Sequence, residues 1–433
     1  MNTPIFDFVK RYIKSDALRM HMPGHKGVGS LGAEQFDITE IGGADSLYEA
    51  NGIIKQSEDN ASSLFGCDTF YSTEGSSQCI RAMLYLVAIN SDKKPLIAAA
   101  RNAHKTFISA AALCGFDICW LYGNDSSYLS CDIDVCELES VLSEQQPAAL
   151  YITSPDYLGK TADIKAIAEI CHRHGVLLLV DNAHGAYLRF LNESKHPIDL
   201  GADICCDSAH KTLPVLTGGA YLHIADNRLS ANAKNALAMF GSTSPSYLIL
   251  ESLDLANKYI ADGYREKLDD FCKKSNALKA RLGEYGYTLY GDEPIKITVC
   301  TKPFGYIGTD FAACLEDRGV VCEFADNDFT VMMLTPESDI TKLEVALCSI
   351  EKKQKINTAP PVLAKCEKVL TAREAMFSQC ETVKASASLG RILAATTVGC
   401  PPAVPIVVSG ERINESAIKC FEYYKITTVS VVK

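Results

Sequence analysis

The segment DSAHKTLPVLTGGA, residues 207–220, places an ionisable lysine, Lys211, beside Ser208 and His210 between two apolar runs. Burying a lysine costs free energy unless its charge is paired or used. Lys211 therefore either extends its ammonium group to solvent or takes part in chemistry. An amine beside hydroxyl and imidazole groups is suited to nucleophilic catalysis.

A second polar group follows the apolar run VLLLV, where the sequence DNAHGAY contains Asp181 and His184. Thirty residues separate Asp181 from Lys211, which is room for a loop and one further strand. Both groups follow apolar runs, so they could line one crevice at the carboxyl ends of neighbouring strands. Taken alone, Asp181 would more often cap a turn and Lys211 would more often reach solvent.

Gly75, Ser76 and Ser77 directly precede an apolar helical pattern in the stretch YSTEGSSQCIRAMLYLVAIN. Free N–H groups and the positive dipole at the start of a helix form a site for a phosphate. The alternative is an ordinary serine cap of the helix. A third polar group, RNAHKTF, follows the run LIAAA and places His104 at the start of another helix.

A phosphate site, a buried acid, a lysine and a ring that can stack are together the groups that bind pyridoxal phosphate. In such a site a lysine forms the Schiff base with the cofactor. A carboxylate keeps the pyridine nitrogen protonated, so that the ring accepts electrons. The polar groups at these strand ends therefore favour a pyridoxal phosphate site.

Short apolar runs alternate with helical patterns over residues 56–285 and predict the elements that must position these side chains. The runs PLIAAA, AALYIT, VLLLV, DICCD and GGAYLHI are typical of strands that are buried on both faces. The pattern predicts a large α/β domain with a parallel or mixed sheet. A long helical segment that starts at PSYLIL leaves this domain and ends at Gly286.

The remainder of the chain predicts two further domains. Residues 286–355 show a strand, a helix and a strand, which indicates a small α/β domain. A proline-rich joint, NTAPPVLAKCEK, introduces a C-terminal domain over residues 356–433.

The composition is typical of a globular protein with a large core, because 47% of the 433 residues are hydrophobic and 22% are charged. The formal net charge of −11 argues against nucleic acid or an anionic membrane as a partner, since both require a basic surface. Eighteen cysteines without a C-x-x-C pair predict free thiols in a reducing cytoplasm. We see no signal-peptide core and no apolar stretch long enough to span a membrane.

Six motifs occur in order along the chain: HMPGHKG (residues 21–27), RNAHK, DNAHGAY, DSAHKTLP, STSPSY and SGERI. They resemble the motifs of the ornithine/lysine/arginine decarboxylases of the aspartate-aminotransferase fold, in a short form without an N-terminal receiver-like domain. The resemblance spans nearly the whole chain. It implies the fold of the type I pyridoxal-phosphate-dependent transferases, with a mostly parallel sheet in the large domain, a small α/β domain and a C-terminal decarboxylase-type domain.

The resemblance also implies roles for individual residues. His104 would stack on the pyridine ring, Asp181 would pair with its nitrogen, and Lys211 would hold the cofactor as a Schiff base. The other cofactor-binding residues would be Gly75, Ser76, Ser77, His184, Ser208, His210 and Thr243. Because the family builds its site at a dimer interface, Thr243 would reach in from the second subunit of a homodimer.

Residues 1–55 would form an N-terminal segment that lines the site, with His25 close to the substrate. A zinc site at His21 and His25 is disfavoured, because Pro23 and Gly24 between them break the helical spacing of a metal pair. We therefore predict no metal.

Two positions depart from the family's pattern: Asn182 stands where glutamate is usual, and Asp156 stands where threonine is frequent. Both follow strands and should lie near the cofactor or the substrate entrance, so the substrate could differ from those of the family. Glu411 of SGERI matches the family's C-terminal glutamate and is, with Asp156, a candidate partner for a substrate cation. The alternative for Glu411 is a solvated carboxylate beside Arg412.

The predicted reaction is α-decarboxylation of a basic amino acid, namely arginine, lysine or ornithine, to its amine and carbon dioxide. Transamination or elimination on the same scaffold stays open, because a fold does not determine a reaction. A regulatory protein that binds the cofactor without turnover is less favoured, since Lys211 and Asp181 are both present.

Overall fold

The computed structural model describes residues 1–123, 132–399 and 405–433. The chain forms two compact units, each assembled from two stretches of the sequence. The first unit comprises Met1–Asp92 and Leu177–Glu266, and the second comprises Lys93–Val176 and Lys267–Lys433. The division into four domains that the sequence suggests stays a prediction.

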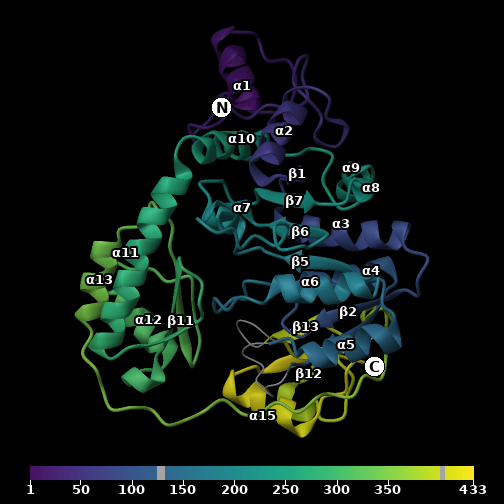
Figure 1. Cartoon of the computed structure of the whole chain (residues 1–433), viewed down its shortest axis with the longest axis vertical. Helices are drawn as coiled ribbons and strands as arrows, with labels where there is room; N and C mark the ends of the chain where they lie inside the picture. The colour runs from purple at the N-terminus through teal and green to yellow at the C-terminus, as the bar shows by residue number, and fades with distance from the viewer. Residues whose placement is uncertain (124–131, 400–404) are drawn as a thin grey trace. The chain divides into compact units, whose positions relative to one another are not determined.

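The first unit contains four strands in the order β1-β7-β6-β5 (Figure 1). They are β1 (Asp68–Ser72), β5 (Leu177–Asp181), β6 (Ile204–Asp207) and β7 (Ala220–Ile224). β5 and β6 are parallel, whereas β7 runs antiparallel to β6 and to β1. The apolar runs VLLLV, DICCD and GGAYLHI thus form strands as predicted, and nearly all of their side chains are buried.

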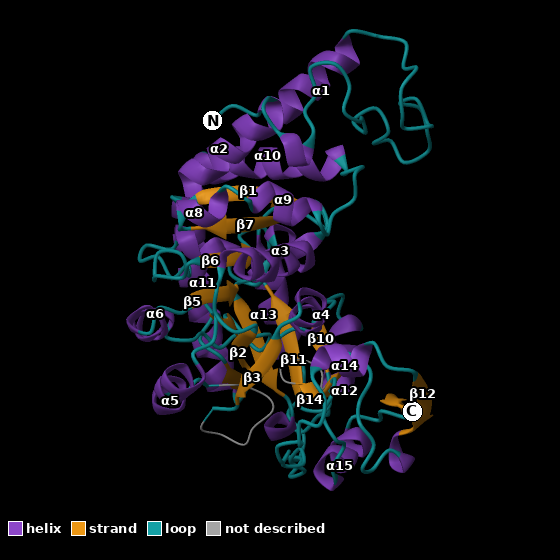
Figure 2. Ribbon diagram, turned by 90° about the vertical axis from the view of Figure 1, so that its right-hand side faces the viewer, coloured by secondary structure: helices purple, strands orange, loops and turns teal. Residues whose placement is uncertain are grey.

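Several helices belong to the same unit as these four strands. They are α1 (Pro4–Lys14), α2 (Ile53–Phe65), α3 (Gly75–Asn90), α7 (Ala209–Thr212), α8 (Asn227–Ser230), α9 (Ala233–Ala238) and α10 (Tyr247–Ala261), with the 3-10 turns η1 (Leu47–Glu49) and η2 (Ala186–Phe190). α3 packs on β5, β6 and β7, while α1 and α10 pack on α2. The long loop between α1 and η1, drawn in teal in Figure 2, carries the HMPGHKG motif.

The start of α1 is held by a residue from a distant part of the sequence. Thr3 at the cap position makes no side-chain cap bond. Instead, the N–H groups of Ile5 and Phe6 both donate to Asp254 Oδ2 of α10 at 3.0 Å. A carboxylate at a helix N-terminus satisfies otherwise unpaired donors and complements the helix dipole.

The second unit contains three parallel strands in the order β4-β2-β3. They are β2 (Leu96–Ala100), β3 (Asp117–Leu121) and β4 (Ala149–Thr153), and the helices between and after them are α4 (Lys105–Cys114), α5 (Val135–Gln145) and α6 (Ile164–Arg173). The three helices begin at the side-chain caps His104, Asp134 and Asp163, respectively. Parallel pairs outnumber antiparallel pairs among β1–β7, so the mostly parallel α/β architecture is confirmed.

A smaller antiparallel sheet follows in the second unit, with the strand order β10-β11-β9-β8. Its strands are β8 (Thr288–Tyr290), β9 (Lys296–Cys300), β10 (Phe324–Ala325) and β11 (Phe329–Met333), accompanied by η3 (Lys302–Phe304), α12 (Gly308–Glu316) and α13 (Ile340–Cys348). The helical segment predicted from PSYLIL to Gly286 is in fact two helices, α10 and α11 (Tyr264–Tyr285). Gly263 separates them, because its φ of +93° lies in the left-handed region and interrupts the helix.

The end of the chain forms two two-stranded sheets around a core of its own. The elements are α14 (Ala372–Met376), β12 (Cys380–Lys384), η4 (Ala385–Ala387), β13 (Thr397–Gly399), β14 (Pro405–Val408), α15 (Glu415–Tyr423) and β15 (Thr428–Val432). β12 pairs with β15, and β13 pairs with β14. Leu393, Ile406 and Phe421 are fully buried in this core.

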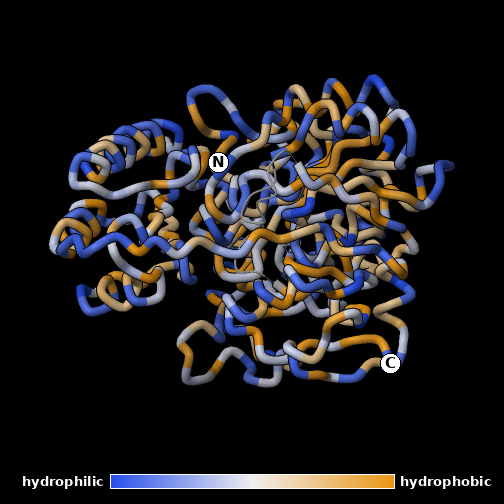
Figure 3. Tube along the Cα trace, turned by 90° about the horizontal axis from the view of Figure 1, so that it is seen from below, coloured by the Kyte–Doolittle hydropathy of each residue, from blue (hydrophilic) through white to orange (hydrophobic). Residues whose placement is uncertain are grey.

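Hydrophobic and hydrophilic residues alternate along much of the chain (Figure 3), and most of the buried side chains are hydrophobic. In the part of the chain that the structure describes, no helix combines the length and the apolar character needed to cross a bilayer.

Candidate active site

Lys211 lies in α7, a single helical turn that follows β6. Its Nζ atom donates to Nε2 of His184 over 3.1 Å. An ammonium group has only donors, so the Nε2 atom of His184 must be the acceptor in this contact. His184 is 4% exposed and comes three residues after the end of β5. The structure therefore brings together an amine and an imidazole from the carboxyl ends of two parallel strands.

Asp181 is the last residue of β5, and its side chain is 3% exposed. Its Oδ1 atom accepts hydrogen bonds from the N–H of Ala183 at 3.2 Å and from the thiol of Cys206 at 3.7 Å. Burial, reinforced by the Asp181 carboxylate, raises the pKa of Cys206 well above its usual value. The thiol therefore stays protonated and remains a donor to Asp181.

The start of α3 is the segment for which the sequence predicts a phosphate site, and that role stays a prediction. Gly75 is the first residue of this 16-residue helix and has a φ of +71°, and no side chain caps the helix. The hydroxyl of Ser208 donates to Ser76 Oγ at 2.7 Å, which joins the two predicted serine segments. Gly75 N–H donates to Gly218 O at 2.7 Å, and a Cβ on Gly218 would lie 2.9 Å from Thr73 O. Glycine is therefore required in the Thr-Gly-Gly turn for this approach.

His210 lies in α7, and Thr243 lies in the loop between α9 and α10 of the same unit. His210 Nδ1 donates to Gly219 O at 3.0 Å, so its ring is anchored to the Thr-Gly-Gly turn. Thr243 is exposed, and its neighbour Ser242 donates its N–H to Glu74 of the same chain. The contribution of Thr243 to a second subunit stays a prediction.

The two histidines of the N-terminal motif have separate partners. His25 Nε2 lies 3.1 Å from Asp37 Oδ2, and the N–H of Gly27 donates to its Nδ1 atom at 2.9 Å. The Tyr12 hydroxyl lies 2.6 Å from His21 Nε2. These contacts hold the loop in place, and the proximity of His25 to a substrate stays a prediction.

His104 lies in the second unit, where it caps α4. Its Nδ1 atom accepts from the N–H of Thr106 at 3.3 Å and lies 3.0 Å from the Thr106 hydroxyl. The imidazole itself is exposed. The cap fixes the orientation of the ring, and the stacking of His104 on a cofactor ring stays a prediction.

Asp156, also in the second unit, is 3% exposed. Its Oδ1 atom accepts from the N–H of Lys160 at 2.9 Å, and its main-chain carbonyl accepts from Lys296 Nζ at 3.3 Å. Asp156 lines a cavity of about 150 Å³ together with Asn102, Asp132 and other residues of the unit. The cavity therefore places a carboxylate close to the RNAHK motif.

The sequence-based alternative of a solvated Glu411 beside Arg412 is wrong. Glu411 is 2% exposed, and its two carboxylate oxygens each accept a hydrogen bond of 2.8 Å from Arg101. Arg412 pairs instead with Glu367 at 2.9 Å. Burial alone would lower the pKa of Arg101, but the Glu411 carboxylate outweighs that effect and raises it. Sequence reasoning missed Arg101, although it is the first residue of RNAHK, because nothing nearby in the chain indicates its partner.

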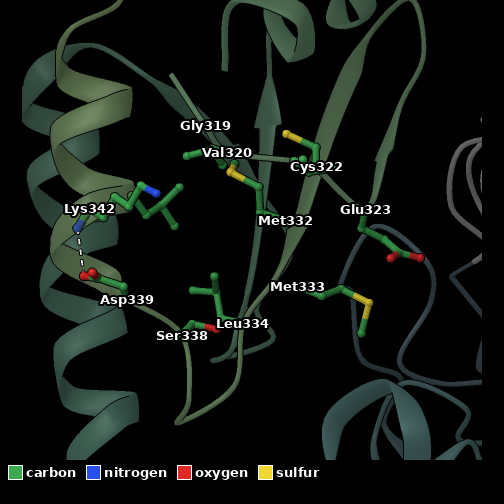
Figure 4. A pocket seen from close by; sticks show the side chains of 12 residues that line it. Gly319, Val320, Cys322, Glu323, Met332, Met333, Leu334, Ser338, Asp339 and Lys342 are labelled. Carbon is green, nitrogen blue, oxygen red and sulfur yellow. Dashed lines mark hydrogen bonds between the residues drawn. The ribbon is translucent and has the colours of Figure 1, made fainter. Parts of the chain in front are cut away.

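A larger open cavity of about 490 Å³ lies beside the small antiparallel sheet (Figure 4). Met332, Met333 and Cys322 line it, and Asp339 and Lys342 stand at its side. The carboxylate of Asp339 accepts from the N–H of Lys342 and so caps α13. None of the residues predicted for the active site lines this cavity.

Two solved structures define the class of fold. Lysine decarboxylase A from Pseudomonas aeruginosa superposes with a TM-score of 0.80 and 17% identity, covering 99% of this chain and 80% of that one. Alanine–glyoxylate aminotransferase from Nostoc sp. superposes with a TM-score of 0.54 and 17% identity, covering 71% of this chain and 92% of that one. The protein has the type I fold of pyridoxal-phosphate-dependent enzymes.

Sequence comparison identifies the family within this class. The family model described as "Orn/Lys/Arg decarboxylase, major domain" matches residues 3–285, and "Orn/Lys/Arg decarboxylase, C-terminal domain" matches residues 354–431. The chain belongs to the Orn/Lys/Arg decarboxylase family. Arginine decarboxylase from Bacillus subtilis (strain 168) is 29% identical over 459 residues, which cover 96% of this chain and 92% of that protein. Arginine decarboxylase from Halalkalibacterium halodurans is 30% identical over 461 residues, which cover 96% and 91%, respectively.

Proposed function

We propose that the protein is a pyridoxal-phosphate-dependent decarboxylase that converts a basic amino acid into its amine and carbon dioxide. The observation that carries this proposal is the contact of Lys211 Nζ with His184 Nε2 at 3.1 Å. The same unit holds the buried Asp181 and the hydroxyl pair of Ser76 and Ser208. In a member of this family, these are the groups that the cofactor requires.

The first unit fits the cofactor by the chemistry of its side chains. Lys211 supplies the amine that binds it covalently, and Asp181 supplies a buried carboxylate that holds a proton on the pyridine nitrogen. The Ser76, Ser77 and Ser208 hydroxyls, which lie at the starts of α3 and α7, suit its phosphate. When bound, pyridoxal phosphate takes up the electron pair that is released as carbon dioxide leaves.

Two histidines support this chemistry in the proposal. His184 accepts a hydrogen bond from Lys211, so it can take a proton from the ammonium group and leave the neutral amine that a nucleophile requires. His104 would stack on the cofactor ring, as the family resemblance implies, and its bond from the Thr106 N–H would set the orientation of the imidazole.

Arginine is the first substrate to test, because the relatives from Bacillus subtilis and Halalkalibacterium halodurans are named arginine decarboxylase. A cationic side chain needs an acidic partner when it leaves water. We propose Asp156 for this role in preference to Glu411, because both oxygens of Glu411 already accept from Arg101. Asp156 lines the 150 Å³ cavity described above.

The experiment compares the decarboxylation of arginine, lysine, ornithine and citrulline, the neutral isostere of arginine. Asp156→Asn should raise KM for the preferred cation at least about tenfold, because a buried ion pair is lost. Asp163→Asn is the matched control: Asp163 lines the same cavity, but it accepts from Ala166 N–H at the start of α6, which asparagine does equally well.

Two results would contradict the proposal. If the protein forms a keto acid and no carbon dioxide from the amino acid, its reaction is transamination and not decarboxylation. Preference of the wild-type enzyme for citrulline would exclude a basic substrate.

We further propose that the protein works as a cytoplasmic homodimer with shared active sites, to which Thr243 of the second subunit contributes. Large apolar side chains of the loop after α1 are exposed in the single chain, and burial against a second copy would remove them from water. They are Leu18, Met20, Met22, Val28 and Leu31. Sedimentation of the purified protein should give the mass of a dimer, and a stable monomer that retains full activity would contradict shared sites.

A further inference from the structure

A buried polar cluster surrounds Asp207, the residue that ends β6 four positions before Lys211. His196 Nε2 and His223 Nε2 each donate to Asp207 Oδ2 at 3.1 Å. Asn182 Nδ2 donates to the other oxygen, Oδ1, at 2.6 Å. All four side chains of the cluster have an exposed fraction of 0%. Sequence reasoning did not select Asp207 or either histidine.

The cluster carries a negative charge that water does not reach. Burial alone would raise the pKa of Asp207, but His196 and His223 outweigh burial and lower it, so the carboxylate stays ionised. Burial lowers the pKa of His223, which favours its neutral form. Among the described residues, His196 Nδ1 has no hydrogen-bond partner, so the contact of its Nε2 atom with Asp207 is what holds the ring.

The cluster lies one residue away from Asp181, on the other face of the strands. Asp181 pairs in register with Cys206, and its carboxylate contacts the Cys206 thiol. Successive residues of a strand point to opposite faces, so Asn182 and Asp207 meet on the reverse side. The N–H of Asn182 also donates to Cys206 O at 3.0 Å. Holding the side chain of Asn182 therefore restrains the direction of Asp181.

This geometry gives a physical reason for the departure of Asn182 from the glutamate that is usual in the family. A carboxylate at position 182 would face the ionised Asp207 at hydrogen-bond distance in a dry environment, where like charges repel strongly. An amide avoids the repulsion and donates the third hydrogen bond to Asp207. The identity of residue 182 is thus coupled to the identity of residue 207.

We propose that Asp207 is a positioning residue for the cofactor site: held by His196, His223 and Asn182, it fixes the ends of β5 and β6 and thereby directs Asp181. This inference rests on the proposed function, because it gives Asp181 its role toward the cofactor. It adds a requirement that positions 182 and 207 together hold one amide and one carboxylate, as Asn182 and Asp207 do.

The test compares three variants: Asn182→Asp, Asp207→Asn and the double exchange that carries both changes. Pyridoxal phosphate is titrated into each apo protein, and its affinity and visible absorption band are recorded without substrate. Asn182→Asp should weaken cofactor binding at least about tenfold and change the band, because two buried carboxylates then meet. The double exchange restores one carboxylate and one amide, and its affinity should return to within about threefold of wild type.

Asp207→Asn should have an intermediate effect, because Asn182 Oδ1, which has no hydrogen-bond partner among the described residues, can turn to accept from the new amide. Asp326→Asn is the control for loss of a buried carboxylate. Asp326 is 5% exposed and accepts from the N–H groups of Asp328 and Phe329 in the small antiparallel sheet. This control should leave the band and the affinity unchanged.

Three results would overturn the proposal. They are wild-type affinity in Asn182→Asp, a double exchange that binds as weakly as Asn182→Asp, and stoichiometric metal in the dialysed wild-type protein. The last result matters because His196, Asp207 and His223 offer ligand atoms within 4.8 Å of one another. A wild-type protein with a normal band but no carbon dioxide release would refute the decarboxylase function alone, whereas absence of any band would refute both.

Discussion

Replacing Glu411 with glutamine should destabilise the second unit strongly, although the side chain keeps its size. Arg101 is 3% exposed and Glu411 is 2% exposed, and two hydrogen bonds of 2.8 Å join them. Glutamine can accept from one guanidinium nitrogen, but it directs an amide N–H toward the other. The charge of Arg101 then stays buried without a counterion, which costs about 3–5 kcal/mol.

The free-energy cost expected for Glu411→Gln corresponds to a large rise in the population of locally open states around this ion pair. At about 1.4 kcal/mol per factor of ten, the population of the locally open state should rise between about a hundredfold and several thousandfold. Hydrogen exchange followed by mass spectrometry measures this rise in peptides from β14 and from the end of β2. Val408 N–H is a direct reporter, because it donates to Glu411 Oε2 at 2.9 Å.

Glu367→Gln is the matched control for this experiment. Glu367 bonds Arg412 at 2.9 Å, a similar length, but the two side chains are 68% and 43% exposed. Ion pairs that stay in water contribute at most about 1 kcal/mol, so exchange should change little. Equal exchange in Glu411→Gln and Glu367→Gln would refute the reasoning from burial. If Glu411→Gln raises KM for the substrate but leaves hydrogen exchange unchanged, Glu411 contacts the substrate and does not stabilise the second unit.

Borohydride reduction of the protein with its cofactor bound should attach the cofactor covalently to Lys211, and peptide mass spectrometry locates the adduct. An adduct on a different lysine would show that the site is wrongly assigned. Asp181→Asn should keep the cofactor but lower kcat at least about 100-fold, because no carboxylate then holds the proton on the pyridine nitrogen; near wild-type turnover would contradict that pairing. Burial, with Asp254 and Asp37 nearby, raises the pKa of Glu251 from 4.5 to about 8, so the folded protein binds this proton more tightly than the unfolded chain. The contribution of Glu251 to stability should therefore fall as pH rises from 4.5 to about 8, and Glu251→Gln should lessen the fall. Thermal unfolding at pH 5 and pH 8 measures the difference, and an identical pH dependence in both proteins would exclude a buried titrating Glu251.

Local patterns in the sequence determined the elements that hold the candidate site. The run LLLV before Asp181 is continuous and apolar, the run ICC before Asp207 is apolar as well, and the two form most of β5 and β6. The residues that directly follow such runs could therefore be selected without a structure, and Lys211 and His184 do meet. This works because strand and helix formation depends mainly on residues that are close along the chain. The family motifs could be read in the same way, since each is a short continuous segment.

Only the tertiary structure decided which charges are paired. Glu411 and Arg101 are 310 residues apart, and Asp207 collects donors from three separate segments. The sequence around Glu411 suggested the adjacent Arg412 as its neighbour, and this was wrong. Charged residues that are far apart in the sequence pair only because the whole unit packs together. Such packing produces no periodic pattern of residues in the sequence from which the pairs could be predicted. Burial then determines how much each ion pair matters for stability. Losing one partner of a pair that stays in water costs at most about 1 kcal/mol, whereas losing one partner of a buried pair costs about 3–5 kcal/mol.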